Sequence, residues 1–224
     1  TLKAANITAN ITSILLDNFT SSNSTNNGAI SNYFNQWQHI TAYGHNGPST
    51  TIFDFEEVNL LPSGWFYEHI RGDSGWEIDS STNQSGWGPG PFMDGSTGAA
   101  TTMNGRYSDE TLSSLITRDY IVPMGANARL RFDHWMCTES NWDGGMILIS
   151  TDSGDTWQPF GQNETNFYDT ISTVNTASPL YNLSIFDGSG AQGGCGSQPW
   201  QVKEAGLSDW TGQKVRFKFL FFSD

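Results

Sequence analysis

Apolar residues recur at every second position near residue 220, which is the pattern of a half-buried β-strand. From Val215 to Phe221 every odd position is apolar, and Arg216 and Lys218 lie between them. Because successive side chains of a strand point to opposite faces of its sheet, this pattern buries one face and leaves the other in water. Residues Arg129 to His134 repeat the pattern. Both segments predict antiparallel strands with one face on an apolar core.

A third segment, Met146 to Ile149, is apolar at every position and lies between glycine-containing turns. A short run of this kind is expected for a central strand that is covered on both faces. The chain also carries 24 Gly, 14 Phe, 9 Trp and 7 Tyr, a composition that favours strands and turns over helices. We therefore expect an all-β fold, a two-sheet antiparallel jelly-roll sandwich with an extended N-terminal arm.

The first 51 residues differ in composition from the rest, because Lys3 and Asp17 are their only Lys, Arg, Asp or Glu residues. We expect residues 1–51 to form an Asn/Ser/Thr-rich arm or linker and residues 52–224 to form the β-sandwich domain. A short duplication of the letters ANIT places Ile7 and Ile11 on one side of an extended chain. We expect a strand here that serves assembly, with Ile7, Ile11 and Ile14 as its apolar residues.

The charge of the chain excludes one class of partner and its hydropathy another. Ten Lys and Arg against 23 Asp and Glu give a net charge of -13, whereas nucleic-acid-binding proteins concentrate basic residues on one face. No apolar run approaches the length of about 18 residues that a membrane-spanning helix needs. We expect neither a nucleic-acid partner nor a membrane span.

Catalytic motifs are weak or absent in this sequence. The four His lack HExxH spacing, and the tetrapeptide Gly72 to Gly75 copies the surroundings of a serine-protease nucleophile only in part. The His and Asp of such a triad should precede the Ser across most of two barrels, and too few residues precede Gly72 for that. The tetrapeptide is better interpreted as a turn, and we expect a protein that is not an enzyme.

Residues 150–157 resemble the Asp-box hairpin, whose Asp and Ser brace a tight turn above a Trp. Propellers carry several copies of this motif, and one copy appears here. The motif therefore predicts a β-hairpin and not sialidase chemistry.

Glycosylation sequons and two cysteines point to an oxidising compartment, so we expect a secreted or cell-surface protein with N-linked glycans. Two isolated cysteines in such a compartment are expected to pair, as a Cys137–Cys195 disulfide. The Asn-x-Ser/Thr sequons are at Asn6, Asn10, Asn18, Asn23, Asn83, Asn163 and Asn182.

Residues 53–224 resemble the MAM-like jelly-roll domains found beside secreted metallopeptidases of the immune-inhibitor-A type and in microbial surface proteins. The matching segments are 53–56 (FDFE), 74–77 (SGWE), 104–108 (NGRYS), 112–114 (LSS), 130–135 (LRFDHW), 143–150 (DGGMILIS) and 215–219 (VRFKF). In that family a further GWxIDD-like strand follows the last segment, and here the sequence stops at Asp224. The peptidase domain that accompanies such modules has no counterpart in the sequence, so the family's proteolysis is not carried over.

The resemblance implies a two-sheet sandwich with one calcium ion near the FxFE strand. Glu56 is the ligand that the matching motif designates, and Asp79, Glu139 and Asp143 are further candidates. Carboxylates on strand ends and loops are the oxygen ligands that calcium prefers.

Together these features favour a non-catalytic extracellular glycoprotein domain for adhesion or assembly. In one form of this function, the protein is a subunit of a surface filament built by strand exchange, in which the arm of one copy completes the sandwich of the next. Its partners would be other copies of itself or surface proteins. One alternative is an accessory domain of a secreted metallopeptidase. Another is a carbohydrate-binding module, since Trp rings near Gly-rich turns can stack on sugars; these are Trp65, Trp76, Trp87 and Trp142.

Overall fold

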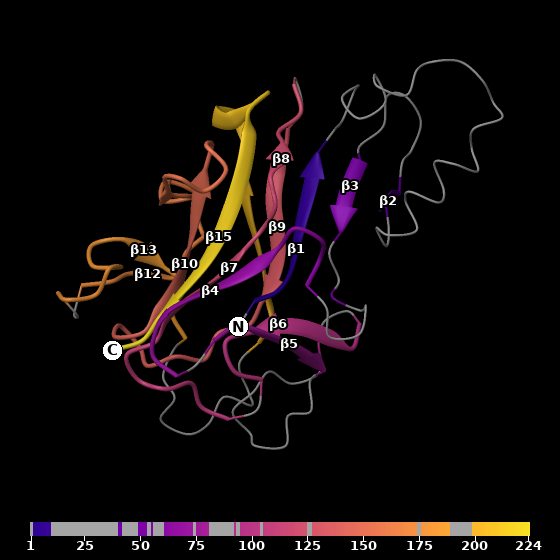
Figure 1. Ribbon diagram of the computed structural model, residues 1–224. Coiled ribbons are helices and arrows are strands. Elements are labelled where there is room, and N and C mark those ends of the chain that lie inside the picture. The colour runs from indigo at the N-terminus through magenta and orange to yellow at the C-terminus, as the bar shows by residue number, and fades with distance from the viewer. Residues whose placement is uncertain are drawn as a thin grey trace, which may run out of the picture.

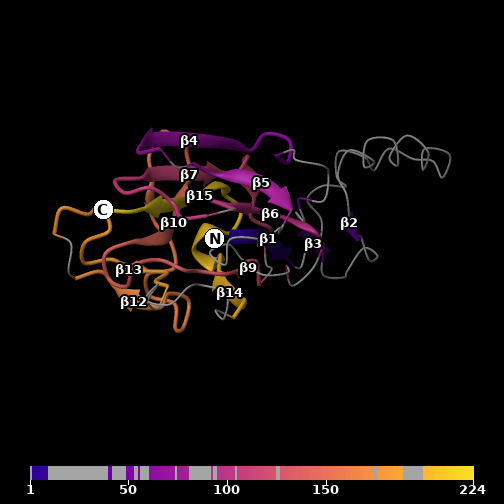
Figure 2. The same cartoon turned by 90° about the horizontal axis from the view of Figure 1, so that it is seen from below.

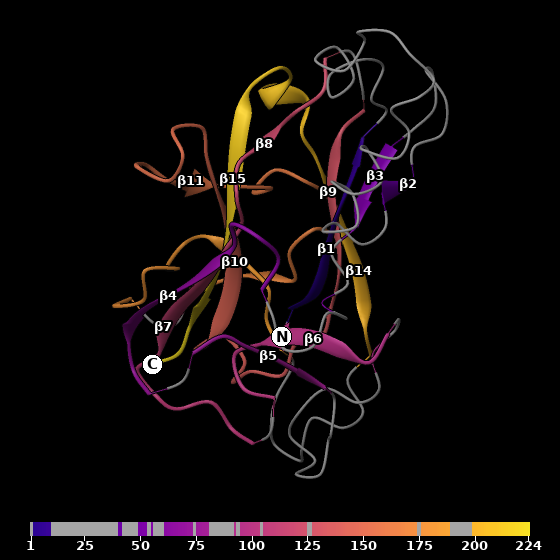
Figure 3. The same ribbon diagram turned by 45° about the vertical axis from the view of Figure 1, so that its right-hand side comes forward.

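The computed structural model describes residues 2–9, 40–41, 49–52, 55, 61–73, 75–80, 92, 95–103, 105–124, 127–173, 176–188 and 199–224. Within these ranges the protein is all-β, and every pair of neighbouring strands is antiparallel, which confirms the expected fold class. Figures 1 to 3 show two large sheets that lie face to face.

The first large sheet has six strands, and its centre is the long strand β15 (Lys214–Phe222). In spatial order its strands are β11 (Gln158–Pro159), β10 (Gly144–Ser150), β15, β7 (Leu112–Ile116) and β4 (Phe66–Arg71), with β8 (Tyr120–Ile121) paired to β15 off this path.

The second large sheet has five strands. In spatial order they are β14 (Gln201–Gly206), β9 (Arg129–His134), β1 (Leu2–Ala9), β3 (Ser49–Ile52) and β2 (Ile40–Thr41). The smaller elements are the pairs β5 (Glu77–Ser80) with β6 (Thr97–Ala100) and β12 (Thr170–Ile171) with β13 (Ser184–Ile185), and the 3-10 turn η1 (Ser208–Trp210).

Aromatic rings fill the space between the two large sheets. Phe132 of β9 is completely buried, and its ring makes edge contacts with Phe219 of β15 at 5.6 Å and with Phe186 at 5.8 Å between centroids. Ile147 and Ile149 of β10 are completely buried in the same core. Burying such side chains contributes about 1.5–3 kcal/mol each, so this layer is the main source of stability.

The outer face of the six-stranded sheet is less exposed than the alternating sequence predicts. Lys218 of β15 is only 8% exposed, because its ammonium pairs with Glu68 of β4 at 2.7 Å and lies 4.6 Å from the ring centre of Trp157. Further along β15, Phe222 packs with Leu180 and Ile185 in a second apolar cluster. The segment that contains β12 and β13 thus shields part of the face that we expected in water.

The predicted hairpin at residues 150–157 is confirmed as the connection between β10 and β11. The Ser150 hydroxyl donates to Asp152 Oδ1 at 2.7 Å, and the Thr156 N–H donates to the same oxygen at 2.9 Å. Gly154 has φ of +102°, a conformation that an L side chain rarely adopts. The motif is therefore a turn brace, as expected.

Part of the expected arm at residues 1–51 is a strand, β1. β1 lies inside the five-stranded sheet, where Asn6 is opposite Arg131 and Ile7 opposite Leu130 of β9. β3 crosses the expected boundary between residues 51 and 52. The local pattern predicted the strand but not its neighbour, since pairing with β9 depends on residues more than 120 positions away. Ile11 and Ile14 lie outside the described residues.

His134 gives the fold a dependence on pH. Its ring is completely buried and in edge contact with the rings of Phe132 and Phe186, and neither nitrogen has a hydrogen-bond partner among the described residues. Burial lowers the pKa of His134 well below its ordinary value, and the positive charge of Lys203 adds to the effect. The unfolded chain therefore binds a proton at this site that the folded protein does not, once the pH falls below about 6.5.

We expect the free energy of unfolding to be unaffected by His134 above about pH 6.5 and to fall by about 1.4 kcal/mol per pH unit below it, until the folded-state pKa is reached. The variant His134→Phe keeps an aromatic ring and should lack this part of the slope between pH 7.5 and 5. Denaturant titrations at several pH values measure it, with His69→Phe on β4 as the matched control. Equal slopes in wild type and His134→Phe would contradict the assignment.

Candidate metal centre

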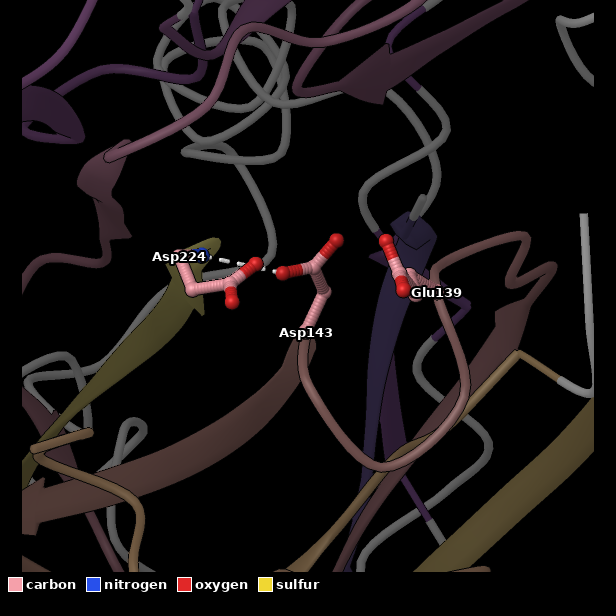
Figure 4. Close-up of side chains that lie close together, drawn as sticks. All are labelled: Glu139, Asp143 and Asp224. Atoms are coloured by element: carbon pink, nitrogen blue, oxygen red, sulfur yellow. Dashed lines mark hydrogen bonds between the residues drawn. The ribbon is translucent and has the colours of Figure 1, made fainter. Parts of the chain in front are cut away.

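Three carboxylates converge at one end of the six-stranded sheet. Glu139, Asp143 and Asp224 each offer an oxygen, and these oxygens lie within 4.8 Å of one another. Figure 4 shows Asp143 between the other two side chains. Asp143 is buried, whereas Glu139 and Asp224 are exposed, so the cluster opens to water on one side.

Antiparallel pairing and a tight loop bring these residues together. Glu139 and Asp143 belong to the loop between β9 and β10, where the Asp143 N–H donates to the Glu139 carbonyl at 3.0 Å. Asn141 within this loop has a φ of +67°, a left-handed conformation that Asn tolerates better than most residues. Gly144, the first residue of β10, is opposite Phe222 of β15, so the same antiparallel register brings Asp143 to the position opposite Ser223, next to Asp224.

Hydrogen bonds hold the buried carboxylate of Asp143. The Tyr107 hydroxyl donates to its Oδ2 at 2.6 Å, and the backbone N–H of Asp224 donates to its Oδ1 at 3.0 Å. The Glu139 N–H donates to the Tyr107 oxygen at 3.0 Å, which ties the loop to the same tyrosine. Tyr107 is therefore the residue that joins two of the three acidic positions.

Burial dominates the electrostatics of this cluster. It raises the pKa of Asp143 to about 6, against the opposing effect of the hydrogen bonds from Tyr107 and Asp224. Burial and the negative charge of Asp143 also raise the pKa of the Tyr107 hydroxyl. Two further carboxylates beside a buried one create a negative site that a cation would neutralise.

The structure brings together two of the four predicted calcium ligands. Glu139 and Asp143 lie in the cluster, whereas Asp79 of β5 accepts hydrogen bonds from the adjacent Ser80 and is not part of it. Glu56 lies outside the described residues. Asp224 was missed. It lies beside Asp143 because β10 pairs with β15, a register that the predicted strands alone do not specify.

The tryptophans that suggested a sugar-binding surface have different environments. Trp65 and Trp76 are buried in the core, which favours a packing role for both. Trp142 is 40% exposed and lies in the same loop as Glu139 and Asp143. Trp87 lies outside the described residues.

The predicted disulfide and glycosylation sites are described only in part. No cysteine among the described residues is a free thiol, and Cys137 is one of these residues. Cys195 lies outside them, so its pairing with Cys137 stays a prediction. Asn163 and Asn182 are exposed, and Asn6 lies in β1. The sequons outside the described residues are Asn10, Asn18, Asn23 and Asn83.

Comparisons with known proteins assign the chain to no family. No family model matches it, and no curated protein does. The solved structures that are similar in part include the K1, K2 and K3 cleaved adhesin domains of Lys-gingipain, of which K1 and K3 are from Porphyromonas gingivalis W83. The K1 domain is 16% identical with a TM-score of 0.39 and covers 75% of this chain and 91% of its own. The corresponding values for K2 are 17%, 0.39, 72% and 88%.

The K3 domain is 16% identical with a TM-score of 0.37, over 73% of this chain and 85% of its own. Likeness at this level carries no functional argument, and the resemblance of residues 53–224 to MAM-like domains stays an expectation. Separately, the part of the chain that the structure describes holds no helix long and apolar enough to cross a membrane.

We expect Tyr107→Phe to destabilise the protein by about 1–3 kcal/mol, because it removes a donor to the buried Asp143 carboxylate and an acceptor for the Glu139 N–H. Urea denaturation measures the change. Tyr181→Phe is the matched control, since Tyr181 is 37% exposed and its loss of a hydroxyl should alter stability little. Equal stability of the two variants would show that the Tyr107 hydrogen bonds contribute little.

For the cysteines, we expect reduction to lower the free energy of unfolding by about 3–4 kcal/mol, the chain-entropy estimate for a long loop closed by one bridge. Peptide mapping without reductant should find one Cys137–Cys195 peptide pair. Two alkylated cysteines in the native protein would contradict the prediction.

Proposed function

We propose that this protein is a non-catalytic extracellular domain for adhesion or assembly, whose sandwich is stabilised by a calcium ion. The observation that carries the proposal is the convergence of Glu139, Asp143 and Asp224 where the β9–β10 loop meets the end of β15. A cation held there would link a loop to the central strand of a sheet. That position supports a structural role for the ion.

Calcium fits the ligands that are present. All three are carboxylates, and calcium prefers oxygen ligands in flexible arrangements, with water completing the coordination at open sites. Glu139 and Asp224 are exposed and can adjust to an ion, while Asp143 is fixed by Tyr107. When bound, the ion would supply positive charge to a cluster that otherwise carries only negative charge.

The described histidines support a role other than catalysis. His134 is enclosed in the core, and the His69 ring is hydrogen-bonded to the Gly72 carbonyl in its own turn. Neither belongs to the acidic cluster. The extracellular location is supported by the sequons and by the exposure of Asn163 and Asn182, whose side chains an oligosaccharide can reach.

We expect calcium to raise the melting temperature and excess EDTA to lower it, because a ligand that binds only the folded state stabilises it by about 2.7 kcal/mol at a concentration of 100 Kd. Thermal unfolding in calcium chloride and in EDTA measures this. Asp143→Asn and Glu139→Gln should abolish most of the response, and Asp209→Asn in η1 should retain it. A melting temperature that is the same in calcium and EDTA would refute the calcium centre.

Carbohydrate binding is the second candidate, and the exposed Trp142 beside Asp143 favours it. An aromatic ring beside polar groups can stack on the apolar face of a sugar. Glycan-array binding that Trp142→Ala abolishes, at unchanged melting temperature, would establish this function. Binding unaffected by Trp142→Ala would exclude this tryptophan as the platform.

Assembly into a surface filament by strand exchange is the finer form of the main proposal. It requires a strand that can pair either with its own sheet or with that of a second copy. β1 is the element that this form of the proposal depends on.

A further inference from the structure

β1 is the strand that joins two parts of the five-stranded sheet. On one side it pairs with β9, from Leu2 opposite His134 to Thr8 opposite Arg129. On its other side it pairs with β3, from Asn6 opposite Ile52 to Ala9 opposite Ser49. Among the described strands, β3 and β2 reach the rest of the sheet only through β1. Figure 3 shows β1 between β9 and β3.

β9 is a well-formed acceptor for such a strand. Its other edge is occupied by β14, from Gln201 opposite His134 to Gly206 opposite Arg129. Its inward residues Leu130 and Phe132 are completely buried in the core. Without a strand in the place of β1, the backbone donors and acceptors along one edge of β9 would be unpaired, which is the condition that favours addition of a strand from another chain.

The chain between β1 and β2 is long enough to permit exchange. The residues 10–39 separate Ala9 from Ile40. A chain of that length spans at most about 100 Å when fully extended, which exceeds the diameter of a small domain. Covalent linkage alone therefore does not restrict β1 to its own β9.

We propose that β1 of one copy occupies the place between β9 and β3 of a second copy, in the same register that the structure shows within one chain. The proposal rests on the assembly form of the proposed function and names its partner, a second copy of this chain. The paired residues of β1 and its neighbours are the same in both arrangements. The free energy of exchange is therefore mainly the entropy of association, and exchange depends on protein concentration. A head-to-tail series of such contacts does not close and builds a filament.

Cysteine cross-linking between separate chains tests the exchange. Ala4 of β1 is opposite Asp133 of β9, and directly opposite residues of an antiparallel pair lie within disulfide range. One chain carries Ala4→Cys and the other Asp133→Cys; they are mixed, unfolded, refolded together at high concentration and oxidised. Both changes leave the Asn6 sequon intact. We expect a covalent heterodimer whose tryptic map contains a disulfide between the two introduced cysteines.

The matched control pairs Ala4→Cys with Arg129→Cys. Arg129 is opposite Thr8, four residues further along, which is about 13 Å and beyond disulfide reach. We expect the in-register heterodimer at about tenfold the yield of this control, since geometry permits only the first. The double variant Ala4→Cys/Asp133→Cys in one chain shows that the pair can form.

Equal yields in the two mixtures, with an efficient bond within the double variant, would overturn the exchange and show that β1 stays in its own sheet. This result would leave the calcium response untouched, so failure of the exchange is distinguishable from failure of the metal centre. Size-exclusion chromatography separates a closed reciprocal dimer from an open series of copies. The dimer would support exchange but exclude the filament, whereas the open series would support both.

Discussion

The pairing of β10 with β15 is the constraint on which the rest of the structure depends. Seven consecutive positions are paired, from Gly144 opposite Phe222 to Ser150 opposite Arg216. One face of this pair supplies the central rings and aliphatic chains of the core, including Phe217, Phe219, Ile147 and Ile149. The same register determines which residues meet at the end of the strands. A shift by one residue would turn the core side chains outward and separate Asp143 from Asp224.

The sequence predicted the strands of this pair well, because each carries a local signal. Alternation identified residues 215–221, and a continuous apolar run between glycine turns identified residues 146–149. The acidic cluster was predicted only in part. Glu139 and Asp143 followed from a resemblance, whereas Asp224 depends on the register between two strands, which no local pattern contains. The environment of Lys218 was missed for a similar reason, since Glu68 and Trp157 reach it from distant parts of the chain.

β1 illustrates the same limit. Its sequence predicts an extended segment, and Leu2–Ala9 is a strand. Its composition, poor in charge and rich in Asn and Thr, also predicts an arm, but composition does not specify which strand the segment pairs with. Membership of a sheet depends on the free edge of β9, and a strand of modest hydrophobicity can pair there because the backbone supplies the hydrogen bonds.

The place of β1 between two neighbours has a mechanical consequence. A force applied along its axis loads the hydrogen bonds to β9 and to β3 in shear, so the bonds of both ladders share the load and must yield together. An edge strand peeled from one side loses its bonds one after another at a lower force. β4, the last strand of the six-stranded sheet, has a single neighbour among the described strands and a register shift between His69 and Arg71. We therefore expect the two sheets to differ in the force that they resist under tension. In the five-stranded sheet this resistance is greatest along β1.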